Sequence, residues 1–346
     1  MMYRAGSAAA TFLLAAALSW GASAQEYVLR LHQFLPITES VPRDGLIPWA
    51  QAVEEASGGR IRVEHYPSMQ MGGAAASLFD QTRDGVVDLA WTVLGYTPGR
   101  FPKSEVFEMP FLVASAEATS RAFQRFVEEN AMDEFAEVKL IAVHTHGPGL
   151  FHTREPVARL EDLANMKIRG GSRVISAMLA DLGAEPIGMP VPQVPESLTL
   201  RVIDGATIPW QVTLSLRTSE IVSNHTEFSG DRGLYTQTFA FIMNQASYDR
   251  LPEDLQQVID DHSGMEWAAL FGRINDQDDA VARQLAVDRG NTIITLDATE
   301  TARWRAAAQV TIEHWLAEAE EQGIDGEGLY TRALELVAEE VAAETE

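Results

Sequence analysis

The chain has 346 residues, 46% of them hydrophobic and 22% charged, and it contains no cysteine. This length and apolar content predict two folded domains and exclude a disordered chain, while the missing cysteine excludes disulfides, thiolate metal sites and a lipid-modified amino-terminal cysteine. With 26 basic against 50 acidic residues, the formal net charge of −24 argues against nucleic acid as a partner, because clustered Lys and Arg must neutralise phosphates. An anionic small molecule then needs a site where positive charge is concentrated locally.

The amino terminus predicts a secretory signal peptide over residues 1–24. Arg4 precedes an uncharged stretch, mainly Ala and Leu, at residues 8–20, and a small-residue cleavage site ends at Ala24. A transmembrane anchor is the alternative interpretation, but the stretch is short and the cleavage site follows at once. We therefore expect export with cleavage after Ala24, and a periplasmic product if the host is a Gram-negative bacterium.

The first part of the mature chain alternates predicted strands and helices. Strands are expected at residues 27–34, 60–66 and 86–91, and helices at residues 46–53 and 78–83. The order β-α-β-α-β predicts a mostly parallel sheet with helices on both faces.

The same alternation returns later in the chain. Residues 166–169 and 184–187 are predicted strands around a helix at residues 172–182. The sequence Val-Val-Asp-Leu-Ala at residues 86–90 resembles Val-Ile-Asp-Gly-Ala at residues 202–206. This weak internal repeat predicts two similar α/β lobes.

The carboxyl-terminal part is predicted to be helical. Pro252 and two acidic residues are favourable for a helix start, and apolar periodicity then continues from Leu255 to about Leu285. Residues 301–322 form another amphipathic pattern. The first of these helices is long enough to brace two lobes.

The most informative segment is Lys167-Ile-Arg169-Gly-Gly-Ser172. An arginine at the end of a strand, followed by two glycines and a Ser at an expected N-cap, places a guanidinium beside free N–H groups of a helix. Such a planar fork suits a carboxylate. Arg173 is a second candidate, and a surface arginine on a turn is the alternative interpretation. The segment resembles no phosphate-binding loop.

Three histidines lie near one another at His144, His146 and His152. The first two would share a strand face, so a zinc site completed by Glu155 is one hypothesis. Hydrogen-bonded histidines near a cleft are the favoured interpretation, because HExxH and GxSxG motifs are absent. The sequence thus gives no positive indication of an enzyme.

Aromatic side chains at predicted strand ends could line a cleft, since ligands of open α/β sheets bind beyond the carboxyl ends of strands. They are Phe34, Trp91, Tyr96, Trp210, Tyr235 and Phe239. Trp91 and Trp210 follow the two repeated segments, so both are expected to face one cleft. Ordinary core packing is the alternative for each of them.

Taken together, several segments resemble the DctP-type solute-binding proteins of tripartite ATP-independent periplasmic (TRAP) transporters. They are GGRIRV at 58–63, QMGG at 70–73, DGVVD at 84–88, KIR at 167–169, GAEPIGM at 183–189, VIDG at 202–205 and LPEDLQ at 251–256. The resemblance implies a two-lobed periplasmic-binding-protein fold of the type II kind, with mixed sheets and a long bracing helix. The family's carboxylate-binding arginine matches Arg169.

The resemblance and the residue patterns together predict interleaved lobes, partners and a site. Residues 25–147 with about 235–274 would form lobe I, and residues 148–234 with about 275–346 would form lobe II. The partners would be an organic anion and membrane-embedded TRAP permease subunits, with no cofactor or metal, and a monomer is expected. The expected ligand-binding residues are Gln33, Phe34, Trp91, Tyr96, His146, Arg169, Arg173, Ile208, Trp210 and Phe239.

Two departures from the family pattern bear on the ligand. Residues 206–209 read Ala-Thr-Ile-Pro where the family usually has Gln-Glu-Asn-Pro, so Ile208 replaces an amide. Residues 147–149 read Gly-Pro-Gly where many members have an arginine. We expect a less polar monocarboxylate, branched or aromatic. The alternatives are an exported metal-dependent hydrolase using the histidines and a receptor for a cationic solute.

Overall fold

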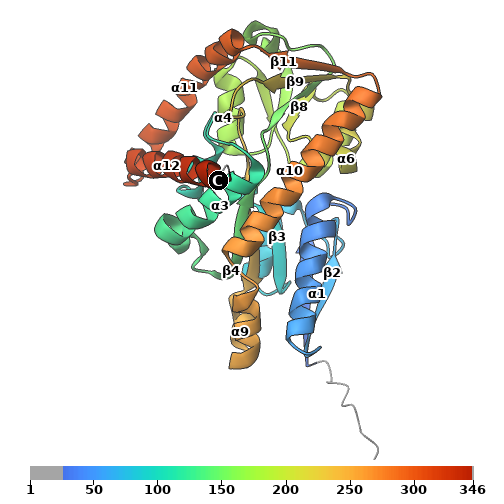
Figure 1. Ribbon diagram of the computed structural model, residues 1–346, viewed down its shortest axis with the longest axis vertical. Helices are drawn as coiled ribbons and strands as arrows, with labels where there is room; N and C mark the ends of the chain where they lie inside the picture. The colour runs from blue at the N-terminus through green and yellow to red at the C-terminus, as the bar shows by residue number, and fades with distance from the viewer. Residues whose placement is uncertain (1–25, 345–346) are drawn as a thin grey trace, which may run out of the picture.

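The computed structural model describes residues 26–344, which form two lobes, each built on its own mixed β-sheet (Figure 1). The predicted signal peptide lies outside the described residues. No helix within residues 26–344 is both long and apolar enough to cross a membrane.

The first lobe contains a five-stranded sheet with the order β2-β1-β3-β10-β4. Its strands are β1 (Tyr27–Gln33), β2 (Ile61–Tyr66), β3 (Leu89–Val93), β4 (Val138–Thr145) and β10 (Thr238–Asn244). β1 pairs in parallel with β2 and β3, which confirms the predicted parallel unit. β10 runs antiparallel to β3 and β4, and this late segment was not predicted as a strand.

The second lobe contains a six-stranded sheet with the order β11-β9-β5-β8-β6-β7. Its strands are β5 (Leu150–Thr153), β6 (Lys167–Gly170), β7 (Glu185–Gly188), β8 (Gly205–Ile208), β9 (Asn224–Phe228) and β11 (Thr292–Leu296). β6 pairs in parallel with β7 and β8, whereas β5 is antiparallel to β8 and β9. The predicted strands at 166–169 and 184–187 are confirmed within one residue at each end.

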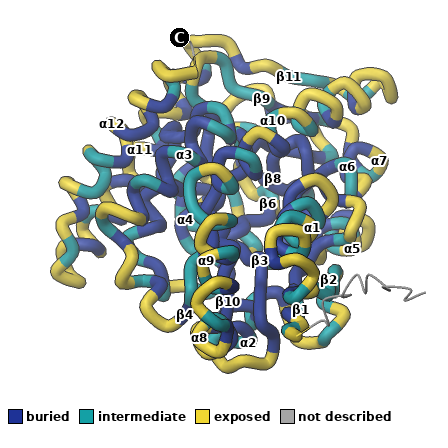
Figure 2. The backbone as a smooth tube through the Cα atoms, turned by 60° about the horizontal axis from the view of Figure 1, so that its bottom comes forward, coloured by how far each residue is buried: buried dark blue, intermediate teal, exposed yellow. Residues whose placement is uncertain are grey.

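Helices cover both sheets. Those of the first lobe are α1 (Ile47–Ala56), α2 (Leu78–Arg83), α3 (Ala116–Phe126), α8 (Gln245–Asp249) and α9 (Glu253–Asp261). Those of the second lobe are α4 (Arg173–Asp181), α5 (Val194–Thr199), α6 (Val212–Leu216), α7 (Thr218–Ile221) and α11 (Ala298–Glu321). In Figure 2 the central strands of both sheets are mostly buried, whereas the edge strands β2, β7 and β11 are partly exposed, as are the outer helices and loops.

The internal repeat corresponds to a contact that occurs once in each lobe. The Asp88 N–H donates to the Arg30 carbonyl at 3.1 Å, and the Asp88 carboxylate accepts from the Arg30 N–H at 2.9 Å. In the second lobe the Asp204 N–H donates to the Lys167 carbonyl, and the Asp204 carboxylate accepts from the Lys167 N–H, both at 2.8 Å. Each aspartate thus joins the start of one strand to its parallel neighbour.

Two chain crossovers and a long helix join the lobes. One crossover links β4 to β5, the other links β9 to β10, and an antiparallel bridge between Gly149 and Tyr235 holds them together. Helix α10 (Met265–Asp288) packs on α3 and β4 and runs diagonally to the second lobe (Figure 1). The single long helix predicted from residue 251 is interrupted between α9 and α10, because Gly264 has a left-handed φ of 82°.

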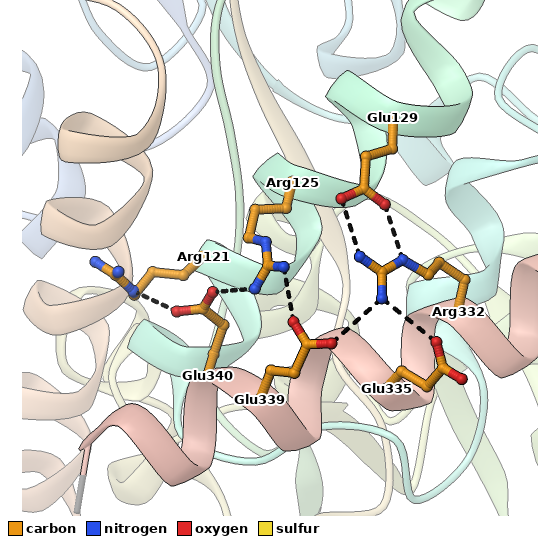
Figure 3. A network of polar contacts seen from close by, with 7 residues as sticks. All are labelled: Arg121, Arg125, Glu129, Arg332, Glu335, Glu339 and Glu340. Carbon is orange, nitrogen blue, oxygen red and sulfur yellow. Dashed lines mark hydrogen bonds and ion pairs between the residues drawn. The ribbon is translucent and has the colours of Figure 1, made fainter. Parts of the chain in front are cut away.

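The carboxyl-terminal helix α12 (Gly326–Glu344) returns to the first lobe, where it packs on α3. Figure 3 shows the ion pairs that fix it there: Arg125 bonds Glu339 and Glu340 at 2.7 Å each, and Arg332 bonds Glu129 at 2.8 Å. The predicted boundary instead assigned residues 275–346 to lobe II. These contacts place α12 beside lobe I, and the lobe boundaries as a whole stay a prediction.

Candidate functional site

A cavity of about 340 Å³ lies between the two lobes. Side chains from both sheets line it, so the lobes are closed on one another around it. Most of the lining is apolar. The residues are Phe34, Leu35, Trp91, Val93, Tyr96, His146, Arg169, Val191, Ile208, Pro209, Gln211, Val212, Gln237 and Phe239.

Arg169 is the only charged residue in this lining, and its side chain is completely buried. It extends from β6, where Nε donates to the Met189 carbonyl at 2.9 Å and Nη1 donates to the Thr207 carbonyl at 3.1 Å. Its remaining nitrogen, Nη2, has no hydrogen-bond partner among the described residues. A buried cation with an unpaired donor destabilises the protein unless an anion accepts a hydrogen bond from that donor. The guanidinium therefore has a donor free for an anionic partner.

The Tyr96 hydroxyl is a second donor in the cavity. It lies in the short helix η3 (Leu94–Tyr96) and accepts a hydrogen bond from the Val191 N–H of the second lobe at 2.9 Å. Burial raises the pKa of Tyr96, and the nearby Arg169 charge opposes this shift. The hydroxyl is thus protonated at neutral pH, and because its oxygen already accepts from Val191, its own proton is available to a ligand.

Stacked aromatic rings form one wall of the cavity. Phe34 stacks on Trp91 with centroids 4.9 Å apart and 13° between planes, and Trp91 stacks on Phe239 at 5.3 Å and 11°. The Trp91 indole N–H donates to His144 Nε2 at 2.8 Å, so the polar end of this ring is already satisfied. The wall consequently offers an apolar aromatic surface, which suits an apolar ligand body.

Each of the three histidines has its own hydrogen bonds. His146 Nε2 accepts from the Gln237 N–H at 3.2 Å, and burial lowers the His146 pKa to about 3, so this ring is neutral. His152 Nδ1 contacts His225 Nδ1 at 2.7 Å, inside the second lobe. The described residues contain no group of three or more side chains that could hold a metal ion. The zinc hypothesis therefore has no support from the geometry.

Seven of the ten predicted site residues meet around the cavity, and three lie elsewhere. Gln33 is buried outside the lining, with both ends of its amide bonded to the backbone of Leu35. Arg173 lies at the cleft edge, where it pairs with Glu105 of the first lobe and Glu318 of α11. These pairs neutralise Arg173, so it is not the free cation that an anion needs. The ligand-binding role of all ten residues stays a prediction.

Trp210 does not share the cavity with Trp91, contrary to the prediction. Its indole N–H donates to Glu227 at 2.8 Å, and its ring lines a different cavity at the crossovers. The reason is register: Trp91 follows Asp88 by three residues, whereas Trp210 follows Asp204 by six. The residue that corresponds to Trp91 is Thr207, whose hydroxyl donates to the Arg169 carbonyl.

The crossover cavity is larger, at about 950 Å³, but its chemistry differs. Three of the charged residues that line it are acidic, Glu227, Asp231 and Asp279, and one is basic, Arg232. The Arg232 guanidinium already donates a hydrogen bond to the Leu112 carbonyl. An anion is disfavoured there. The interlobe cavity is therefore the candidate site, although it is the smaller of the two.

Two polar cavity residues, Gln211 and Gln237, were not predicted. Gln211 precedes α6, and its side-chain oxygen accepts from the Ser40 hydroxyl across the lobe boundary at 3.4 Å. Gln237 directly precedes β10. Neither lies in a recognisable motif: Gln211 reaches the cavity from the turn between β8 and α6, and Gln237 from the end of the second crossover.

Comparison with known proteins gives a family and several similar structures. The model of the DctP family, described as bacterial extracellular solute-binding protein, family 7, matches residues 38–319. The chain is 44% identical to a TRAP solute-binding protein of an unidentified marine microbe, specific for aromatic acid ligands and solved with metahydroxyphenylacetate; the TM-score is 0.89, over 91% of this chain and 99% of that one.

Two further solved structures are similar over nearly the whole chain. A TRAP solute-binding protein from Rhodoferax ferrireducens with copurified benzoate is 41% identical, with a TM-score of 0.89 over 92% of this chain and 99% of that one. One from Bordetella bronchiseptica with bound (R)- and (S)-mandelate is 31% identical, with a TM-score of 0.83 over 90% and 99%. The three named ligands each combine one carboxylate with one aromatic ring.

Proposed function

Because the chain belongs to the DctP family of bacterial extracellular solute-binding proteins, we propose that it is the receptor of a TRAP transporter for an aromatic monocarboxylate. The ligand would be a benzoate-like or phenylacetate-like acid. Arg169 would hold its carboxylate, and the wall of Phe34, Trp91 and Phe239 would hold its ring.

The observation that carries this proposal is that Nη2 of the fully buried Arg169 has no hydrogen-bond partner in the part of the chain that the structure describes. One buried cation without a carboxylate partner favours a ligand with one negative charge. A dicarboxylate would bury a second charge against apolar residues, at a cost of several kcal/mol. The cavity geometry therefore favours a monocarboxylate.

The choice of an aromatic acid is supported by the aromatic wall and by the three similar structures. Ile208 is buried and adds apolar surface where an amide would contact hydroxyl groups of a sugar acid. A hydroxylated ligand would leave its polar groups unpaired against these side chains, which costs free energy.

Ligand contacts on both lobes provide a reason for closure. Arg169 and Ile208 belong to the sheet of the second lobe, whereas Phe34, Trp91 and Phe239 belong to the first lobe. A ligand that contacts both lobes stabilises the closed state over an open one. We further propose that the chain is cleaved after Ala24, acts in the periplasm as a monomer and passes its ligand to the membrane permease subunits of the transporter.

Isothermal titration calorimetry of the purified mature protein tests this function. The panel contains benzoate, 3-hydroxybenzoate and mandelate, with succinate and gluconate as the competing classes. We expect the aromatic acids to bind at least about tenfold more tightly than the other two, since a buried group left unpaired costs about 1–3 kcal/mol. Tight binding of succinate or gluconate alone would contradict the proposal.

A further inference from the structure

Gln237 occupies a distinctive place in the cavity. It is the last residue of the second crossover, immediately before β10 of the first lobe, and only 4% of it is exposed. Its side chain lines the same cavity as Arg169, which extends from the second lobe.

The backbone around Gln237 is firmly held. Its N–H donates to His146 Nε2 at 3.2 Å, and the neighbouring Thr236 hydroxyl donates to the His146 carbonyl at 2.6 Å. Since His146 is neutral and buried, these bonds are shielded from water. The start of the Gln237 side chain is thus fixed relative to the first crossover.

The amide nitrogen of Gln237 is closely packed but has no hydrogen-bond partner among residues 26–344. It lies so close to Gly171 of the second lobe that a Cβ at residue 171 would be 2.2 Å from Oε1 and 2.6 Å from Nε2. No partner among the described residues hydrogen-bonds Nε2, which is nevertheless shielded from solvent. A buried donor in this condition destabilises the protein unless something else accepts its hydrogen.

We propose that the Gln237 amide donates to the carboxylate held by Arg169 and is thereby part of the first-lobe side of the anion site. This inference rests on the proposed function. A carboxylate has enough lone pairs for the Arg169 fork, the Tyr96 hydroxyl and the Gln237 amide together. Because Arg169 and Gln237 belong to opposite lobes, a carboxylate bonded to both links occupancy directly to closure.

The decisive variant is Gln237→Leu, which keeps a similar volume and removes the donor. We expect benzoate affinity to fall about 10- to 100-fold, in the range for one hydrogen bond to a charged group. The apo protein should unfold at the same temperature or a higher one, because an unpaired buried donor has been removed. A purely structural glutamine predicts the reverse, a lower unfolding temperature with affinity largely unchanged.

Two more variants sharpen the test. Gln237→Glu places a carboxyl group beside the ligand, so benzoate affinity should fall further and recover as the pH is lowered. Gly171→Ala keeps the glutamine but displaces its amide, so it should also weaken binding. The matched control is Gln245→Leu, the same change at an exposed helical position outside the cavity.

The outcomes separate this inference from the function on which it rests. If the wild type and the Gln245→Leu control do not bind benzoate or 3-hydroxybenzoate, the proposed function fails. If both bind benzoate but Gln237→Leu binds within about twofold of them, only the role of Gln237 is overturned. A lowered unfolding temperature of apo Gln237→Leu with unchanged affinity also overturns it.

Discussion

The Ser172 hydroxyl donates a 2.5 Å hydrogen bond to the Glu108 carboxylate across the boundary between the lobes. Ser172 is the N-cap of α4 in the second lobe, where its oxygen also accepts from the Ile175 N–H at 3.1 Å. Glu108 ends the short helix η4 (Ser104–Glu108) of the first lobe and is 1% exposed. The closed arrangement therefore buries a carboxyl group against a helix start.

This contact predicts a pH dependence. Burial raises the pKa of Glu108 from 4.5 to about 7. The hydrogen bonds from Ser172 and Thr238 lower this pKa, and the nearby Glu105 charge raises it by a smaller amount. A raised carboxyl pKa means that the folded protein holds the proton more tightly than the unfolded chain. The contribution of Glu108 to the free energy of unfolding is fully present below pH 4.5. It is lost as the pH rises to about 7, and the total loss is on the order of 3 kcal/mol.

Glu108→Gln should remove this part of the pH dependence. We expect its unfolding temperature to fall less than that of the wild type between pH 5 and pH 8. Glu134→Gln is the matched control, because the Glu134 pKa is also raised to about 7 but its partners Ser104 and Lys103 lie in the first lobe. Both variants should flatten the stability profile, and only Glu108→Gln should also flatten the pH profile of benzoate affinity. Equal effects on affinity would contradict an interlobe role.

Ser172→Ala should destabilise the protein more than an ordinary N-cap loss. Removing the cap costs about 1 kcal/mol, and leaving the buried Glu108 without one donor costs about 1–3 kcal/mol more. Ser115→Ala is the control, since Ser115 caps α3 in the same way and its other partner, Glu344, is exposed. Chemical denaturation measures both. A Ser172→Ala effect no larger than that of Ser115→Ala would show that the bond to Glu108 adds nothing.

Ile208→Asn tests the apolar lining that the second lobe contributes to the cavity. Ile208 is 1% exposed, and an amide there would face apolar side chains and the ligand ring. We expect benzoate affinity to drop at least about tenfold, the effect of one unpaired buried polar group. Gluconate should lose much less affinity or gain some. Calorimetric titration of both acids gives the ratio, and an unchanged ratio would remove Ile208 from the specificity site.

Local patterns in the sequence predicted much of the architecture because their physical causes are local. The N-cap at Ser172 and the arginine at the end of β6 follow from residues within one turn, and both were confirmed in position. The repeated Val-Val-Asp and Val-Ile-Asp segments also have a physical basis, the matching contacts of Asp88 and Asp204.

The predictions that were wrong or missing depend on strand register and on pairing between distant segments. Trp210 was aligned with Trp91 although three residues separate the two registers, so the predicted second tryptophan lies in another cavity. Gln237 could not be found from the sequence, because its place depends on how β10 returns to the first sheet. Gly264 is an ordinary helix residue in a periodicity argument, and only its left-handed φ separates α9 from α10.

The most direct test of the account is benzoate binding by Arg169→Gln, measured by calorimetry beside the wild type. Arg273→Ala is the control, since Arg273 forms an exposed pair with Glu117 on the surface. Circular dichroism spectra of each variant serve as the check that it is folded. We predict that Arg169→Gln loses at least about 100-fold in affinity, as expected when one partner of a buried charge pair is removed, and that Arg273→Ala matches the wild type. Affinity of Arg169→Gln within about threefold of the wild type would contradict the claim that Arg169 holds the carboxylate.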